Sequence, residues 1–124
     1  MPIDTRHPRE IRREIRQGKL TGITAGLGQN FVQANLAALP KDLAYDFLVF
    51  CQRNPRPCPL LEVTDVGSAE PVGVAPGADL RTDIPKYRIY KDGVLADEVT
   101  DATPYWRDDL VAFLLGCSFT FEWA

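Results

Sequence analysis

The chain has 124 residues, of which 45% are apolar and 25% are charged, and its formal net charge is -3. This length favours one domain covering residues 1–124, and the composition is typical of a globular protein. The slightly negative charge gives no reason to expect binding to nucleic acid. No apolar run approaches the roughly 20 residues that a membrane-spanning helix needs, so no membrane segment is predicted.

The N-terminal residues and the cysteine count indicate a compartment. The opening residues, MPIDTRHPREIRREIR, contain no apolar core, so they do not predict a secretory signal. The chain has three cysteines, an odd number, which favours reduced thiols over a disulfide framework. We therefore expect a cytoplasmic protein.

A first helix is predicted over residues 8–17. Thr5 or His7 can cap its start, and a proline follows at the first helical position. Ile11 and Ile15 then form a narrow apolar stripe at i and i+4, while arginines cover the other faces. This pattern is typical of a surface helix whose charged side is solvated.

The middle of the chain predicts a second helix followed by a strand. Val32–Leu39 is mildly apolar and fits either a short strand or a helical turn. Pro40–Arg53 predicts a helix, because a proline opens it and its large apolar residues repeat at helical spacing. Leu60–Thr64 then reads as a buried strand.

The C-terminal part predicts a β-hairpin and a third helix. Lys86–Val99 contains two strand-like runs separated by Asp92-Gly93, which is a strong signal for a two-residue turn. Arg107–Leu115 is predicted as a short helix with acidic residues in its first turn and a glycine after its end. The expected fold class is therefore mixed α/β, with short strands, one hairpin and three helices.

The stretch Phe47–Glu62 places a polar, proline-rich turn between two apolar segments, and several kinds of site are conceivable there. A metal site would use the cysteines with the single histidine, but their spacing fits no common zinc pattern, so no metal is expected. A nucleophilic cysteine at Cys117 would need a nearby base, and the single histidine lies far away in sequence. Buried structural thiols are the simpler interpretation.

A third kind of site would bind a small carboxylate. Several arginines lie near turns or element ends, where guanidinium groups can converge on a carboxylate in bidentate geometry. They are Arg53, Arg81, Arg88 and Arg107. Acidic residues lie close to them in sequence, so ordinary ion pairs at element ends explain the same pattern. The spacing alone leaves these two interpretations open.

Three longer sequence segments help to choose among these kinds of site. They read CQRNPRPCPLLEVTD (Cys51–Asp65), APGADLRTDIPKYRIYKDG (Ala75–Gly93) and WRDDLVAFLLGCSFTFE (Trp106–Glu122). Together they resemble the D-glutamate cyclase family, whose members are also described as hydro-lyases. The resemblance covers nearly the whole chain and implies an α/β fold. It also implies that the chain corresponds to the N-terminal half of the longer family members.

The resemblance implies a dehydration in which D-glutamate closes to 5-oxo-D-proline and releases water. It implies no cofactor and a small carboxylate or amino acid as substrate. The residues expected to take part in catalysis are Glu62, Cys117 and Ser118. Those expected to bind the substrate are Arg53, Asn54, Arg81, Asp83 and Arg88.

A second interpretation is a truncated, non-catalytic homologue that binds a small carboxylic acid or a partner chain. The C-terminal end carries three large aromatic residues, Phe119, Phe121 and Trp123. Such an apolar end either packs into the core or meets a second chain, and in the second case a homo-oligomer is expected.

Overall fold

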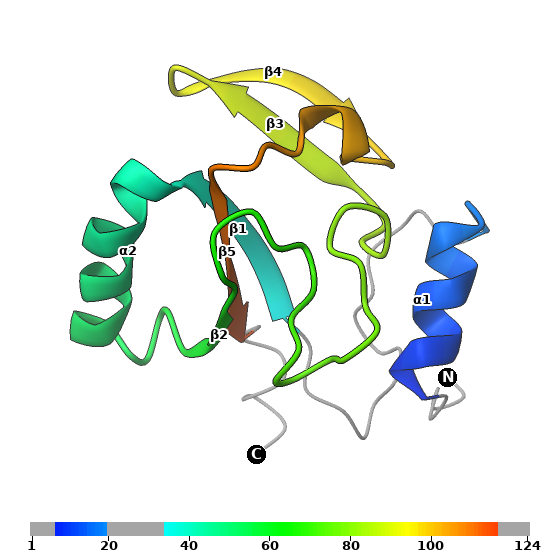
Figure 1. Cartoon of the computed structure of the whole chain (residues 1–124), viewed down its shortest axis with the longest axis horizontal. Coiled ribbons are helices and arrows are strands. Elements are labelled where there is room, and N and C mark those ends of the chain that lie inside the picture. Colours follow the sequence, from blue (N-terminus) through cyan, green and yellow to red (C-terminus); the bar gives the residue numbers. More distant parts are fainter. Residues whose placement is uncertain (1–6, 20–33, 117–124) are drawn as a thin grey trace. The chain divides into compact units, whose positions relative to one another are not determined.

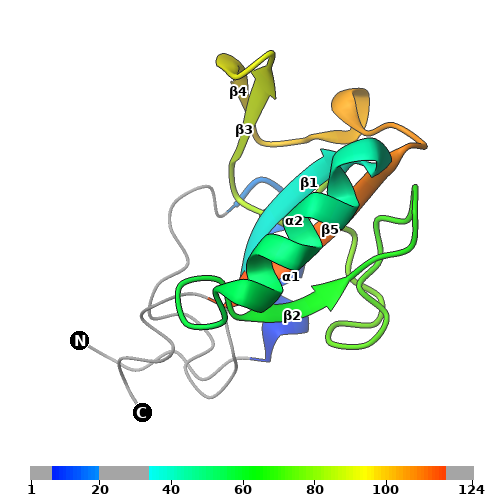
Figure 2. The ribbon, with the colours of Figure 1, turned by 90° about the vertical axis from the view of Figure 1, so that its left-hand side faces the viewer.

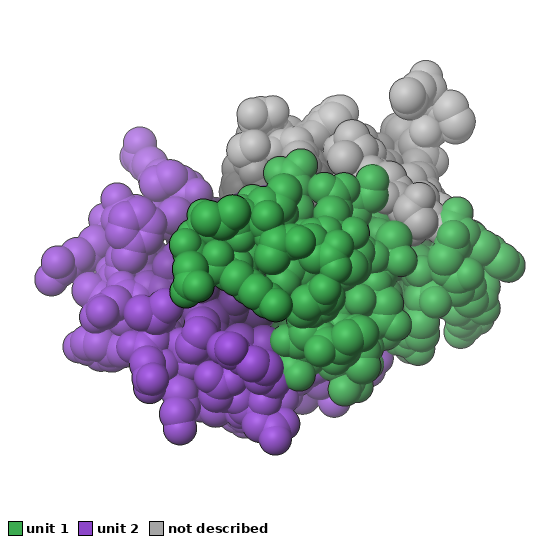
Figure 3. All heavy atoms as spheres, turned by 90° about the horizontal axis from the view of Figure 1, so that it is seen from above, with its two compact units in different colours: residues 1–31, 78–106 green, residues 32–77, 107–124 purple. Residues whose placement is uncertain are grey.

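The computed structural model of the chain describes residues 7–19 and 34–116. The chain divides into two compact units, shown in different colours in Figure 3. The helix–hairpin unit contains residues 1–31 and 78–106, and the sheet unit contains residues 32–77 and 107–124. Each unit is therefore assembled from two stretches of the chain that lie far apart in sequence.

The sheet unit is built on three strands and one helix (Figure 1). The strands are β1 (Ala34–Pro40), β2 (Leu60–Val63) and β5 (Leu110–Gly116), in the order β1-β5-β2. β5 pairs antiparallel with both neighbours, so β1 and β2 run parallel to each other on either side of it. The helix α2 (Lys41–Arg53) connects β1 to β2 and lies across one face of the sheet (Figure 2).

β5 forms the core of this sheet. Its residues from Leu110 to Leu114 are all buried, on both faces of the strand. Phe113 is 1% exposed, and its ring packs edge-on against Phe47 of α2, with the ring centroids 4.8 Å apart.

The predicted helix over Arg107–Leu115 is wrong, because residues 110–116 form the strand β5. A short, continuous apolar run fits a strand buried on both faces as well as it fits a buried helix, and only the pairing partners distinguish the two.

Hydrogen bonds extend the sheet beyond the end of β2. The Thr64 N–H donates to the Ala112 carbonyl at 2.9 Å, and the Thr64 hydroxyl oxygen accepts from the Ala112 N–H at 3.0 Å. The Gly67 N–H then donates to the Leu110 carbonyl at 2.7 Å. Gly67 has a φ of 81°, and a Cβ at this position would lie 2.8 Å from the Asp108 carbonyl oxygen. A residue without a side chain is thus required where the loop crosses the start of β5.

The helix–hairpin unit contains α1 (Pro8–Arg16), the strands β3 (Tyr87–Lys91) and β4 (Val94–Val99), and the 3-10 turn η1 (Thr103–Tyr105). His7 caps the N-terminus of α1, since its Nδ1 accepts from the Arg9 N–H at 3.1 Å. The buried apolar residues of this unit come from α1, from β3 and from the loops that flank the hairpin: Ile11, Ile15, Ala78, Leu80, Tyr87 and Ala102. The unit therefore has a small apolar core of its own.

The hairpin between β3 and β4 turns at Asp92 and Gly93. These residues have φ values of 52° and 78°, the left-handed backbone that an Asp-Gly turn adopts. The predicted hairpin is confirmed.

The structure confirms the mixed α/β class but not the number of helices. The helices predicted near residues 8–17 and 40–53 are present, and so is the strand predicted at Leu60–Thr64. The segment left open at Val32–Leu39 forms β1 in its described part. The residues that the structure describes hold two α-helices and five strands, so the third predicted helix is absent there. No helix among them is long and apolar enough to cross a membrane.

Candidate functional site

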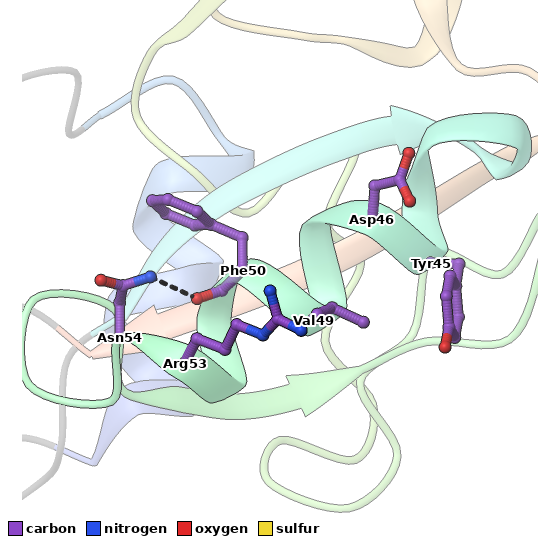
Figure 4. A pocket seen from close by; sticks show the side chains of 6 residues that line it. All are labelled: Tyr45, Asp46, Val49, Phe50, Arg53 and Asn54. Atoms are coloured by element: carbon purple, nitrogen blue, oxygen red, sulfur yellow. Dashed lines mark hydrogen bonds between the residues drawn. The ribbon is translucent and has the colours of Figure 1, made fainter.

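A shallow depression of about 400 Å³ lies on the solvent-facing side of α2 (Figure 4). Its lining comes entirely from α2 and the residue that caps its end: Tyr45, Asp46, Val49, Phe50, Arg53 and Asn54. Positions 46, 49, 50 and 53 follow one stripe of the helix, which is why they share a surface. Two residues predicted to bind substrate, Arg53 and Asn54, are thereby placed together.

Arg53 is the cation of this depression. It is exposed, and within the residues that the structure describes its side chain makes no ion pair or hydrogen bond. Figure 4 shows its side chain extending along the outside of α2 toward Val49. Because its guanidinium group is open to solvent, it can take up a carboxylate in bidentate geometry. Its place in the last helical turn also suits the negative end of the helix dipole.

Asn54 is held by the end of the helix. Its side-chain amide donates to the Phe50 carbonyl at 2.8 Å, and its backbone N–H donates to the Cys51 carbonyl at 3.2 Å (Figure 4). One amide hydrogen and the amide oxygen are not used by these bonds. Asn54 therefore has a fixed position beside Arg53 and can still contact a ligand.

Glu62 lies in the same unit, at an irregularity of β2, where the pairing with β5 shifts register. One carboxylate oxygen accepts from the Val74 N–H at 2.8 Å, and the other accepts from the Gly73 N–H at 3.1 Å. These bonds tie the loop after β2 to the strand. Each oxygen keeps free lone pairs, so the carboxylate is oriented and still able to accept a proton.

Asp83 lies in the helix–hairpin unit and is enclosed by hydrogen bonds. Its side chain is 2% exposed and forms a bidentate ion pair with Arg16 of α1, with N–O distances of 2.8 and 2.7 Å. It also accepts from the Asp79 N–H at 2.8 Å and from the Thr82 hydroxyl at 2.9 Å. Burial pushes the pKa of Asp83 upward, but the hydrogen bonds outweigh burial, so this pKa lies below its ordinary value. Asp83 thus fastens its loop to α1.

Arg81 is held in the same loop by Asp79. Its Nε and a terminal nitrogen donate to the two Asp79 carboxylate oxygens, both at 2.9 Å. The hydrogen bonds from Arg81 hold the pKa of Asp79 below its ordinary value. The side chain of Arg81 remains 42% exposed, so its remaining N–H groups face solvent. It is oriented and still accessible to an anion.

Arg88 lies on β3 with an exposed side chain, 3.8 Å from the carboxylate of Glu98 on β4. This is a long contact between solvated groups. It corresponds to the simple ion pairing at element ends that the sequence also allowed.

The remaining predicted residues, Cys117 and Ser118, lie outside the described residues. Of the other cysteines, Cys51 is buried and Cys58 is partly exposed, and both are free thiols. Within the described part of the chain, no group of three or more histidine, cysteine and acidic residues is arranged to hold a metal ion.

The sequence pattern does not indicate several residues that shape these sites. Arg16 belongs to the helix face that the sequence pattern predicts to be solvated, yet it is the partner of Asp83. Tyr87 donates its hydroxyl to the Leu80 carbonyl at 2.6 Å, and burial raises its pKa above the ordinary value. Asp46 and Tyr45 line the depression beside Arg53. The helical spacing of positions 46 and 53 could have indicated a shared stripe, but no local signal pairs Arg16 with Asp83.

Comparison with known proteins identifies close relatives. A protein named "Putative hydro-lyase" from Thermoanaerobacter sp. (strain X514) is 71% identical over 115 residues, which are 93% of this chain and 43% of that protein. Relatives with the same designation from Bacillus velezensis and Bacillus subtilis (strain 168) are 63% and 60% identical over 117 residues. Those matches cover 94% of this chain and 44% and 46% of the relatives.

No family model matches the chain. The chain spans a little under half the length of the curated relatives it matches. At 60–71% identity over most of its residues, the chain is nevertheless a homologue of proteins that carry the name hydro-lyase.

Proposed function

We propose that this chain forms part of a hydro-lyase and supplies its anchor for a substrate carboxylate. The observation that carries this proposal is the 60–71% identity to named hydro-lyases over nearly the entire chain. The depression on α2 supports the anchoring role. It combines an arginine that has no partner within the described residues with a carboxamide fixed beside it.

For the reaction, we propose the closure of D-glutamate to 5-oxo-D-proline. This reaction is chosen because three long segments of the sequence resemble the D-glutamate cyclase family. The amino group attacks the carbon of the substrate's own γ-carboxyl group, a C–N bond forms, and water leaves. Such a step needs a cation for the α-carboxylate, a base that deprotonates the ammonium group and an acid that protonates the departing oxygen.

The residues can be assigned to these roles. Arg53 binds the α-carboxylate, with Asn54 beside it. Glu62 exchanges a proton with the substrate, since its carboxylate is fixed by two backbone N–H groups and retains free lone pairs. The other proposed contributors are Arg81, Asp83 and Arg88 as substrate-binding residues, and Cys117 and Ser118 as catalytic residues. For Asp83, the contribution is to hold the loop that carries Arg81.

The direct test is turnover with D-glutamate. The full-length Bacillus subtilis relative and this chain are each incubated with D-glutamate, and 5-oxo-D-proline is quantified by chiral liquid chromatography with mass spectrometry. L-glutamate and heat-treated protein are the controls. We expect the relative to form the D-product selectively. We also expect the melting temperature of this chain to rise with D-glutamate or 5-oxo-D-proline. No product from the relative, together with no stabilisation of the chain, would reject the proposal.

A second candidate is a non-catalytic homologue that binds a small carboxylic acid or a partner chain. The observation that favours it is the exposed depression on α2, where Arg53 and Asn54 lie together and could hold a carboxylate without a catalytic step. It predicts that the chain is stabilised by the acid but forms no 5-oxo-D-proline, even at high protein concentration. Turnover by the isolated chain would exclude this candidate.

A further inference from the structure

The loop between α2 and β2 brings two cysteines together. Cys51 lies in the last turn of α2 and is 1% exposed, and Cys58 lies in the loop and is partly exposed. Two successive turns join them: the Asn54 N–H donates to the Cys51 carbonyl at 3.2 Å, and the Cys58 N–H donates to the Asn54 carbonyl at 3.0 Å. Burial first, and then the neighbouring Cys58 side chain, raise the pKa of the Cys51 thiol.

The composition of the loop maintains this arrangement. Pro55, Pro57 and Pro59 alternate through it, and each proline ring fixes one backbone angle. A loop with few accessible conformations loses little entropy when its ends are joined. The helix on one side and the strand β2 on the other hold both ends of the segment.

We propose that Cys51 and Cys58 are a modification site that closes reversibly into an intrachain disulfide. The oxidant is a low-molecular-weight disulfide such as oxidised glutathione. The partly exposed Cys58 meets it first, while the buried Cys51 acts as the resolving thiol. Burial, together with the neighbouring Cys58, raises the pKa of the Cys51 thiol, which keeps it protonated until that second step.

The chemistry balances in two exchange steps. The Cys58 thiolate attacks one sulfur of oxidised glutathione, a new S–S bond forms, and one glutathione thiolate leaves and is protonated. Cys51 then loses its proton and attacks the Cys58 sulfur of the mixed disulfide, which expels the second glutathione. Two protein thiols are oxidised to one disulfide, and one molecule of oxidised glutathione is reduced to two thiols.

The test uses the folded chain carrying Cys117→Ser, so that only this pair can react. The protein is equilibrated in buffers with increasing ratios of oxidised to reduced glutathione, quenched in acid, unfolded and alkylated with N-ethylmaleimide. Intact mass and peptide mapping then report the state of each cysteine. We expect both alkylation sites to disappear together, with a mass lower by two hydrogen atoms and a cross-link within residues 51–58. Reduction with dithiothreitol should restore both sites.

The matched control adds Cys58→Ser, which leaves the buried thiol without a partner. We expect its Cys51 to remain reduced throughout the folded series and to react only after unfolding. The proposal is overturned if both thiols of the Cys117→Ser protein stay alkylatable in excess oxidised glutathione. It is also overturned if a stable glutathione adduct accumulates on Cys58 while Cys51 stays reduced, or if the cross-link forms only in the presence of denaturant.

Discussion

At the scale of single residues, Asp83 joins α1 to the loop that precedes the hairpin in the helix–hairpin unit. Its buried carboxylate accepts four hydrogen bonds from α1 and from its own loop. Arg16, the partner, is half exposed, so water screens one side of the pair. A buried carboxylate that loses its charge leaves these donors poorly satisfied, which costs more than breaking an exposed pair.

We predict that Asp83→Asn lowers the free energy of unfolding by about 2 kcal/mol, as measured by urea denaturation. The matched control is Glu98→Gln, which removes a carboxylate whose contacts to Lys86 and Arg88 are long and solvated. That change should stay within about 0.5 kcal/mol of the wild type. Equal losses in the two variants would show that Asp83 is not a structural anchor.

The contribution of the Asp83 carboxylate to stability should depend on pH. The folded-state pKa of Asp83 lies below the unfolded value, so its charge stabilises the fold above that unfolded value, about pH 4, and the contribution disappears as the pH falls through the folded pKa. We therefore expect the stability difference between wild type and Asp83→Asn to be constant near neutrality and to shrink below about pH 4. Thermal melts of both proteins from neutral to acidic pH measure it. A difference that grows on acidification would contradict the assignment.

The sequence predicted part of this residue-scale organisation. It indicated that Arg53 and Arg81 lie at element ends, and it named Asp83 as a site candidate. It could not pair Asp83 with Arg16, because the two residues are 67 positions apart and meet only through tertiary packing. Helical periodicity describes a helix face, but it does not say which loop covers that face.

At the scale of elements, the central strand β5 determines how the sheet unit is assembled. It separates β1 from β2, and it also receives the loop after β2 through Thr64 and Gly67. The apolar spacing predicted α1 and α2, and the Asp-Gly turn signal predicted the hairpin. The helix predicted over Arg107–Leu115 rested on acidic residues in its first turn and a glycine after its end. That prediction was wrong for β5, because a run without polar residues carries no period and its two neighbouring strands come from earlier in the chain.

Gly67 provides a test of how the loop is seated on β5. We predict that Gly67→Ala lowers the free energy of unfolding by about 2 kcal/mol or more, since the new methyl group would meet a backbone carbonyl in a left-handed residue. Gly77→Ala is the control, because Gly77 also has a positive φ but open space around it. It should cost about 1 kcal/mol. Urea denaturation that gives the same loss for both would mean that the approach to Asp108 is not tight.

At the scale of the whole molecule, each compact unit is formed from separated parts of the chain, and each holds some of the proposed substrate residues. Arg53, Asn54 and Glu62 belong to the sheet unit, whereas Arg81, Asp83 and Arg88 belong to the helix–hairpin unit. The sequence could suggest all six residues, but it could not assign them to the two units. That assignment requires knowing that residues 107–116 pair with residues 34–63. The longer homologues are named hydro-lyases, and D-glutamate as the substrate is our proposal.

The proposed carboxylate anchor is tested by the affinity of the chain for D-glutamate, determined by isothermal titration calorimetry for the wild type, Arg53→Gln and Arg56→Gln. Arg56 is an exposed arginine of the neighbouring loop that does not line the depression. Losing a charge-assisted bidentate contact should weaken binding about 10-fold or more for Arg53→Gln. Arg56→Gln should retain the wild-type affinity, and circular dichroism should show both variants folded. Equal affinities in all three proteins, or no binding by the wild type, would contradict the proposed carboxylate anchor.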